Sequence, residues 1–193
     1  MKNIFYTLVL LLTMSCQAQQ TLSLTNYQPK YAINNNYIKD IDGKLDPFVG
    51  TWEWNNGSGT IFRIKFIKAI RNKTMATDKY FMDDIFGGYQ YIVNGVELVN
   101  TLNFTTTVSL TDYLDFAPLV CTADNPEFKN LHISASDRLK AKLCSADFTI
   151  QDLTSSTLTA HWKLRNIEYY RSPNDPPKPI DFSIPTDVVL TKL

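Results

Sequence analysis

The sequence predicts an all-β domain: an antiparallel up-and-down β-barrel is the main expectation, and a two-sheet β-sandwich is the alternative. Three observations lead to this class. Residues 60–68 and 157–165 alternate apolar and polar side chains with the period of two that is typical of a half-buried strand. Asn94-Gly95 joins two further strand-like segments. About ten short strand candidates account for the domain, and no segment has a convincing helical period.

The first fifteen residues are expected to form a signal peptide. Lys2 supplies a positive start, and the apolar run at residues 4–12 is too short to span a bilayer, which needs ~20 residues. Ser15-Cys16 follows and resembles the lipobox cut by lipoprotein signal peptidase, so Cys16 is predicted to carry the lipid of the mature chain. The alternative is cleavage after Ala18, which would give a freely secreted protein.

Without the first 15 of its 193 residues the chain keeps 178, enough for one ordinary domain. Residues 16–36 are polar and are predicted to be a lipid-anchored tether, and residues 37–193 a single β domain. The chain has 19 Lys and Arg against 19 Asp and Glu, so no nucleic-acid partner is expected. We expect an exported protein of the cell envelope, held at the outer membrane by its lipid alone.

Within the domain, eight of the strand candidates can be given bounds. They are residues 51–54, 60–68, 89–93, 96–99, 131–135, 141–150, 157–165 and 187–192. Asn94-Gly95 predicts a type I′ hairpin turn, because both central residues of that turn need positive φ. Gly87-Gly88 precedes one strand and is expected to form a bulge or tight bend. The proline-rich residues 172–179 predict a rigid exposed loop.

The remaining cysteines form an even pair once Cys16 is used for lipid. Cys121 and Cys144 would close a loop with 22 residues between them and are predicted to form a disulfide, with two buried free thiols as the alternative. Their spacing to His132 and His161 is not that of a structural zinc site, so no metal is expected.

The inventory of catalytic motifs is thin, and we expect neither an enzyme nor a cofactor. There are two histidines, no Gly-x-Ser-x-Gly elbow and no His-Glu-x-x-His helix. Asp83 and Asp84 are neighbours on a strand and would point to opposite faces. Asp40-x-Asp42-Gly43 has the start of a calcium loop but Thr51 stands where its closing glutamate would be, which favours a polar turn.

Gly50-Thr51-Trp52 enters the first long strand and resembles the Gly-x-Trp pattern of lipocalins and other calycins. The resemblance implies a barrel whose closed end is plugged by the tryptophan. Over most of its length the chain also resembles a family of small bacterial lipoproteins classed as a domain of unknown function. The segments that carry this second resemblance are 15–19, 37–41, 45–52, 87–92, 94–95, 99–103 and 184–190. It implies an envelope location and one β domain, and it brings no known activity.

Two functional hypotheses follow. In the first, the barrel binds a small or apolar ligand through aromatic side chains at its mouth or interior, for which the candidates are Trp52, Trp54, Phe62, Tyr89 and Tyr91. In the second, the core is filled and the protein is a structural or protein-interaction module that uses its loops and edges. The presence or absence of an internal cavity distinguishes the two.

Overall fold

The structure is a computed structural model that describes residues 19–28, 30, 35–73, 80–103, 119–123, 127–167 and 180–193, with the backbone alone for 71–73 and 120–123. These residues form eleven strands and one short 3-10 helix, η1 (Leu24–Asn26). The strands are β1 (Thr21–Ser23), β2 (Tyr37–Lys39), β3 (Gly50–Asn55), β4 (Thr60–Lys73), β5 (Phe81–Val93), β6 (Val96–Asn100), β7 (Leu119–Ala123), β8 (Asn130–Asp137), β9 (Lys142–Ile150), β10 (Thr159–Asn166) and β11 (Asp187–Lys192). The predicted signal peptide, Cys16 and the loop at 172–179 lie outside the described residues.

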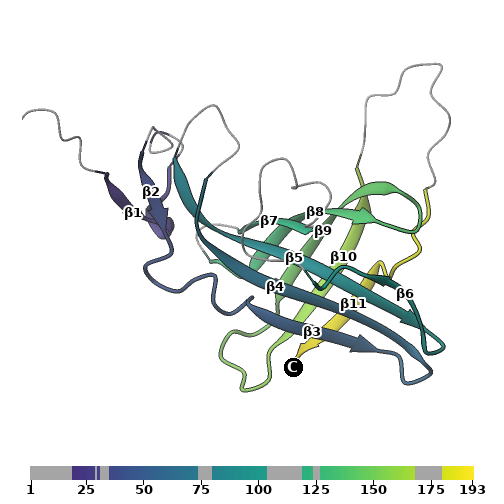
Figure 1. The fold of residues 1–193 in the computed structure, drawn as a ribbon. Coiled ribbons are helices and arrows are strands. Elements are labelled where there is room, and N and C mark those ends of the chain that lie inside the picture. Colours follow the sequence, from purple (N-terminus) through teal and green to yellow (C-terminus); the bar gives the residue numbers. More distant parts are fainter. Residues whose placement is uncertain are drawn as a thin grey trace, which may run out of the picture.

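All the strands belong to one strongly curled, barrel-like sheet (Figure 1). Eight of them, β3 to β5 and β7 to β11, pair antiparallel in a circuit that returns to its start: β3–β4–β5–β7–β8–β9–β10–β11–β3. The predicted all-β, barrel-like class is confirmed. The sandwich alternative is wrong for the described strands, because they form one sheet.

Two of the strand pairings in the circuit, β5–β7 and β3–β11, involve few residues, and we call them the seams of the barrel. β5 and β7 share three residue pairs, and β3 and β11 share two, whereas β4 and β5 share twelve. β5 can take part in the circuit and also hold β6, because it is 13 residues long and pairs with β7 through its middle and with β6 near its end.

The N-terminal strands extend the sheet in a way that the sequence did not predict. β1 pairs parallel with β2, and β2 pairs parallel with the start of β5. The sheet therefore begins at Thr21, inside the segment that was expected to be a tether. In Figure 1, β1 and β2 lie at one end of the molecule, and the β3–β4 and β5–β6 hairpins project at the other.

The hairpin prediction is confirmed, since β5 and β6 are joined by Asn94 at φ 52° and Gly95 at φ 76°. The bend predicted at Gly87-Gly88 is wrong: both glycines lie within β5. A Cβ on Gly87 would come within 2.8 Å of Phe66 Cδ1 and 3.1 Å of Leu119 Cδ1. The glycine is needed for close packing across strands rather than for a turn.

Candidate functional site

The aromatic residues predicted to bind a ligand come together on the concave face of the sheet. Trp54 is paired with Phe62, and Phe62 is paired with Tyr91, so these three side chains form one row across β3, β4 and β5. The ring of Phe62 lies 5.9 Å from that of Tyr89 and 6.3 Å from that of Tyr91. Four of the five predicted residues are thus neighbours.

Trp52, the fifth, belongs to a separate group nearer the other end of the barrel. Its ring meets that of Phe148 edge to face at 4.9 Å, and Phe66 meets Phe148 in the same manner at 4.9 Å. The Trp52 indole donates to the carbonyl of Phe48 at 2.8 Å. The polar group of the indole is therefore satisfied inside the core.

These rings fill the interior that was a candidate cavity. Trp52 and Phe62 are fully buried, Tyr89 is 1% exposed, and Trp162 bridges toward them from β10 with its ring 5.6 Å from that of Phe62. Ring centroids at these separations are those of aromatic pairs in direct contact. In the described part of the sheet, these aromatic residues belong to one core together with buried aliphatic side chains.

Two of the candidates remain accessible at the edge of that core. Trp54 and Tyr91 are half-buried, and Val96 at the start of β6 is 59% exposed. We call these three residues the apolar lip. They lie beside the β3–β4 and β5–β6 hairpins (Figure 1).

The opposite end of the barrel carries a buried polar network that sequence analysis missed. The side chain of Asp40 is fully buried and accepts hydrogen bonds from the Lys44 amide at 2.7 Å and the Leu45 amide at 3.0 Å. Lys68 Nζ lies 2.7 Å from Asp40 Oδ2 and 2.8 Å from Asp46 Oδ1. The network ties the turn after β2 to β4.

Asp83 continues this network from β5. It accepts from the Tyr37 hydroxyl at 2.7 Å and from the Asp40 amide at 2.9 Å. Asp83 is buried and Asp84 is half-buried. Asp40 and Asp83 therefore accept hydrogen bonds from the chain between β2 and β3 and from Tyr37 on β2. These bonds hold that segment over this end of the core.

The charge states of the network follow from these contacts. Burial raises the pKa of Asp40, but hydrogen bonds from Lys68 and the amides of Leu45 and Lys44 outweigh it and hold the pKa below 3.8. Burial lowers the pKa of Lys68, and its bonds to Asp40 and Asp46 outweigh burial and raise that pKa above 10.5. Both groups are therefore charged at neutral pH.

Lys68 itself could have been found in the sequence. Phe62, Ile64 and Phe66 occupy the buried face of β4, and Lys68 is the next residue on that face. A buried lysine is costly unless it is paired with an anion, so a lysine in a row of buried positions predicts a nearby carboxylate. That carboxylate is Asp40.

Cys144 is a buried free thiol on β9, so the predicted disulfide with Cys121 is not formed. The backbone explains why. Cys121 is on β7 and β8 lies between the two strands, which puts the cysteines roughly 10 Å apart when a disulfide needs Cα atoms within about 7 Å. The side chain of Cys121 lies outside the described residues.

The surroundings of Cys144 make it unreactive. Burial raises the pKa of its thiol to about 11. Nearby, burial raises the pKa of Tyr89 to about 12, and its hydroxyl donates to the Ser136 carbonyl at 2.9 Å and accepts from the Arg138 amide at 3.0 Å. A buried thiol whose pKa is raised is less reactive than an exposed one, and Cys144 packs as a core residue.

The two histidines lie on the convex face, each beside an aspartate. His132 Nδ1 is 2.8 Å from Asp147 Oδ1, and His161 Nε2 is 2.6 Å from Asp187 Oδ1. Among the described residues, no group of three or more His, Cys, Asp or Glu is arranged to hold a metal ion, and no helix is long and apolar enough to cross a membrane.

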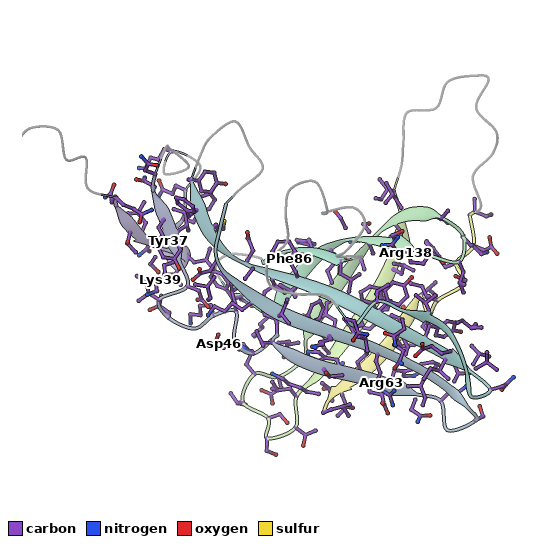
Figure 2. All side chains as sticks on the ribbon, in the orientation of Figure 1. Tyr37, Lys39, Asp46, Arg63, Phe86 and Arg138 are labelled. Atoms are coloured by element: carbon purple, nitrogen blue, oxygen red, sulfur yellow. The ribbon has the colours of Figure 1, made fainter. Side chains whose placement is uncertain are left out.

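A surface hollow of about 640 Å³ lies at the N-terminal end, lined by residues 21–23 of β1, 25–26 of η1 and 27–28 after it. Ser23 and Thr25 on its wall donate to Asp42 at 3.2 and 3.0 Å. Tyr37 and Lys39 in Figure 2 mark this end of the molecule, and Arg63 lies toward the opposite one.

Comparison with known proteins gives a family and no characterised relative. No curated protein and no solved structure matches the chain. One family model, described as a family of unknown function (DUF6705), matches residues 1–193. This agrees with the resemblance to an uncharacterised family seen in the sequence, and the chain belongs to the DUF6705 family.

Proposed function

We propose that this protein is an exported lipoprotein, anchored at the cell envelope through Cys16, whose barrel-like domain is a non-enzymatic interaction module. The filled interior carries the proposal. Trp52, Phe62 and Tyr89, three of the residues expected to contact a ligand, are at most 1% exposed and pack ring against ring. A ligand pocket occupies a few hundred Å³ or more, which interlocked rings do not leave free.

The convex face supports the same function. Arg63 Nε binds Glu53 at 2.6 Å, and Arg63 also reaches Gln90 across the next strand. Together with the His161–Asp187 pair, these contacts place hydrogen-bonded polar side chains on several strands of the outer surface. Exposed pairs contribute little stability, and such a surface suits recognition of another polar surface.

A second candidate function is capture of an apolar ligand at the mouth instead of in the interior. It is favoured by the apolar lip, where Trp54 and Tyr91 are half-buried and Val96 is exposed. Aromatic faces that stay accessible beside a rigid core are common contact points for apolar groups. This candidate needs shallow binding only and is compatible with a filled barrel.

Native mass spectrometry of the detergent-extracted protein, compared with a Cys16→Ala variant, tests both candidates. We expect a mature chain that begins at Cys16, carries a diacylglycerol and holds no second small molecule. A releasable small molecule on the wild-type chain would favour ligand capture. An unlipidated chain that begins at Gln19 would overturn the anchoring, and the interaction module would then be a secreted one.

A further inference from the structure

The sheet begins very close to the predicted lipid attachment. Four residues lie between Cys16 and Thr21, the first residue of β1, and the five Cα–Cα steps from one to the other can span at most about 18 Å. If Cys16 carries a lipid, β1 must therefore lie within that distance of the bilayer surface. The expected tether of 16–36 would have allowed a far greater distance.

β1 is fixed to the rest of the domain. It pairs with β2 over three residues, the Tyr37 amide donates to the Gln20 carbonyl at 2.8 Å, and Leu24 of η1 is buried in the core. Ser23 adds a hydrogen bond to Asp42. Because these contacts hold β1 on the sheet, the place where the chain enters the sheet also sets which end of the domain faces the membrane.

That end exposes two isoleucines. Ile41 is 59% exposed and follows Asp40, whose amide donates to Asp83 on β5 at 2.9 Å. Ile70 is 63% exposed and lies on β4 at the irregularity opposite the same part of β5. Both are thus held around one stretch of the sheet, next to β2.

Two exposed lysines accompany the isoleucines. Lys39 and Lys44 are exposed, and neither forms an ion pair within the described part of the chain. The exposed carboxylate between them, Asp42, is hydrogen-bonded to Ser23 and Thr25. We call Lys39, Ile41, Lys44 and Ile70 the N-terminal patch. Apolar side chains flanked by cations are the composition of surfaces that bind the headgroup region of a bilayer.

We propose that the N-terminal patch rests on the bilayer, so that the domain is held against the membrane in one orientation with the β3–β4 and β5–β6 hairpins directed away from it. This rests on the proposed lipid attachment at Cys16. The orientation places the apolar lip at the far end, where a partner or ligand can reach it (Figure 1).

Ile41 and Val96 provide a matched pair of positions for the test, because both are 59% exposed. Ile41 lies two residues after β2 and Val96 is the first residue of β6, and β2 and the β5–β6 hairpin lie at opposite ends of the molecule (Figure 1). Each is replaced by cysteine in the lipidated mature protein, labelled with an environment-sensitive fluorophore and reconstituted into vesicles of phosphatidylcholine and phosphatidylglycerol. Unsubstituted protein, treated identically, gives the background from the native cysteines. Quenching by spin-labelled lipid measures depth in the bilayer.

We expect strong quenching of the label in Ile41→Cys and none above background in Val96→Cys. Replacing both Lys39 and Lys44 by glutamine should reduce the bilayer-contacting population in the phosphatidylglycerol vesicles, with the contact equilibrium falling on the order of tenfold. Ile70→Asn should also reduce quenching at position 41, whereas Val189→Asn, an exposed position on β11, should not.

The mass of each purified protein separates the two proposals. A protein without lipid on Cys16 would contradict the proposed anchoring. A lipidated protein whose labels at positions 41 and 96 are quenched equally, or not at all, would overturn the orientation alone.

Discussion

Two aspartates bind the same ammonium group in different surroundings. Lys68 Nζ is 2.7 Å from Asp40 and 2.8 Å from Asp46, but the side chain of Asp40 is fully buried and that of Asp46 is 65% exposed. Because the two distances are equivalent, the difference in how much each ion pair stabilises the folded state comes from how exposed its aspartate is to solvent. An exposed ion pair is screened, whereas a buried charge left without its partner is strongly destabilising.

Asp40→Asn should lower the free energy of unfolding by about 2–3 kcal/mol at pH 7, because it leaves Lys68 facing an amide instead of a carboxylate. Asp46→Asn should cost about 0.5 kcal/mol or less. Urea unfolding of the two variants measures both values. If both variants lose the same free energy of unfolding, the burial of Asp40 does not increase its contribution to stability.

The same pair predicts a dependence on acid. The pKa of Asp40 is lower in the folded protein than its ordinary 3.8, so the unfolded chain binds more protons as the pH falls through that value. The stability due to Asp40 is present above pH 3.8 and is lost as the pH falls toward the folded pKa. In Asp40→Asn, this part of the acid-side decline should be absent.

At the scale of elements, β5 and the turn that follows it illustrate two kinds of glycine. Gly95 lies in a turn whose positive φ is a local property, and the dipeptide Asn94-Gly95 was sufficient to predict it. Gly87 has its role only because β4 and β7 bring Phe66 and Leu119 against it. Nothing in the neighbouring sequence identifies those contacts.

Gly87→Ala should destabilise the protein by about 1–3 kcal/mol, since the new methyl group would overlap the ring of Phe66 and crowd Leu119. The double variant Gly87→Ala with Leu119→Ala should lose less than the sum of the two single variants, because the second change makes room for the first. Thermal and urea unfolding give the values. Simple additivity would mean that the contact with Leu119 is not responsible.

At the scale of the whole molecule, the short seams decide how the barrel opens. β3 and β11 share two residue pairs, with one further bond from the Leu193 amide to the Thr51 carbonyl at 2.9 Å, against twelve pairs between β4 and β5. Local opening follows the least connected part of a structure.

Hydrogen exchange followed by mass spectrometry should therefore find faster exchange at the β3–β11 seam, by roughly tenfold or more over the paired core of β4 and β5. Leu190 is buried, Lys192 Nζ donates to the Pro47 carbonyl at 2.8 Å, and β11 is paired with β10 over five residues, so β11 should remain attached while the seam opens. Equal protection of the seam and of β4–β5 would contradict this mode of opening.

The sequence by itself determined the features that depend on local spacing. Period-two alternation located β4 and β10, Asn94-Gly95 located the hairpin, and the all-β class followed from their number. It also named Phe62, Tyr89 and Tyr91 as candidates for the mouth or interior of the barrel.

The tertiary structure alone decided what those faces enclose and which distant residues meet. It packed Trp52 and Phe62 into the core, separated Cys121 from Cys144 by a strand, joined Lys68 to Asp40, and placed β1 within the sheet. Each of these outcomes depends on strand order and register between segments far apart in the chain. A period of two fixes the side of the sheet on which a residue lies, and the neighbouring strand fixes what it touches.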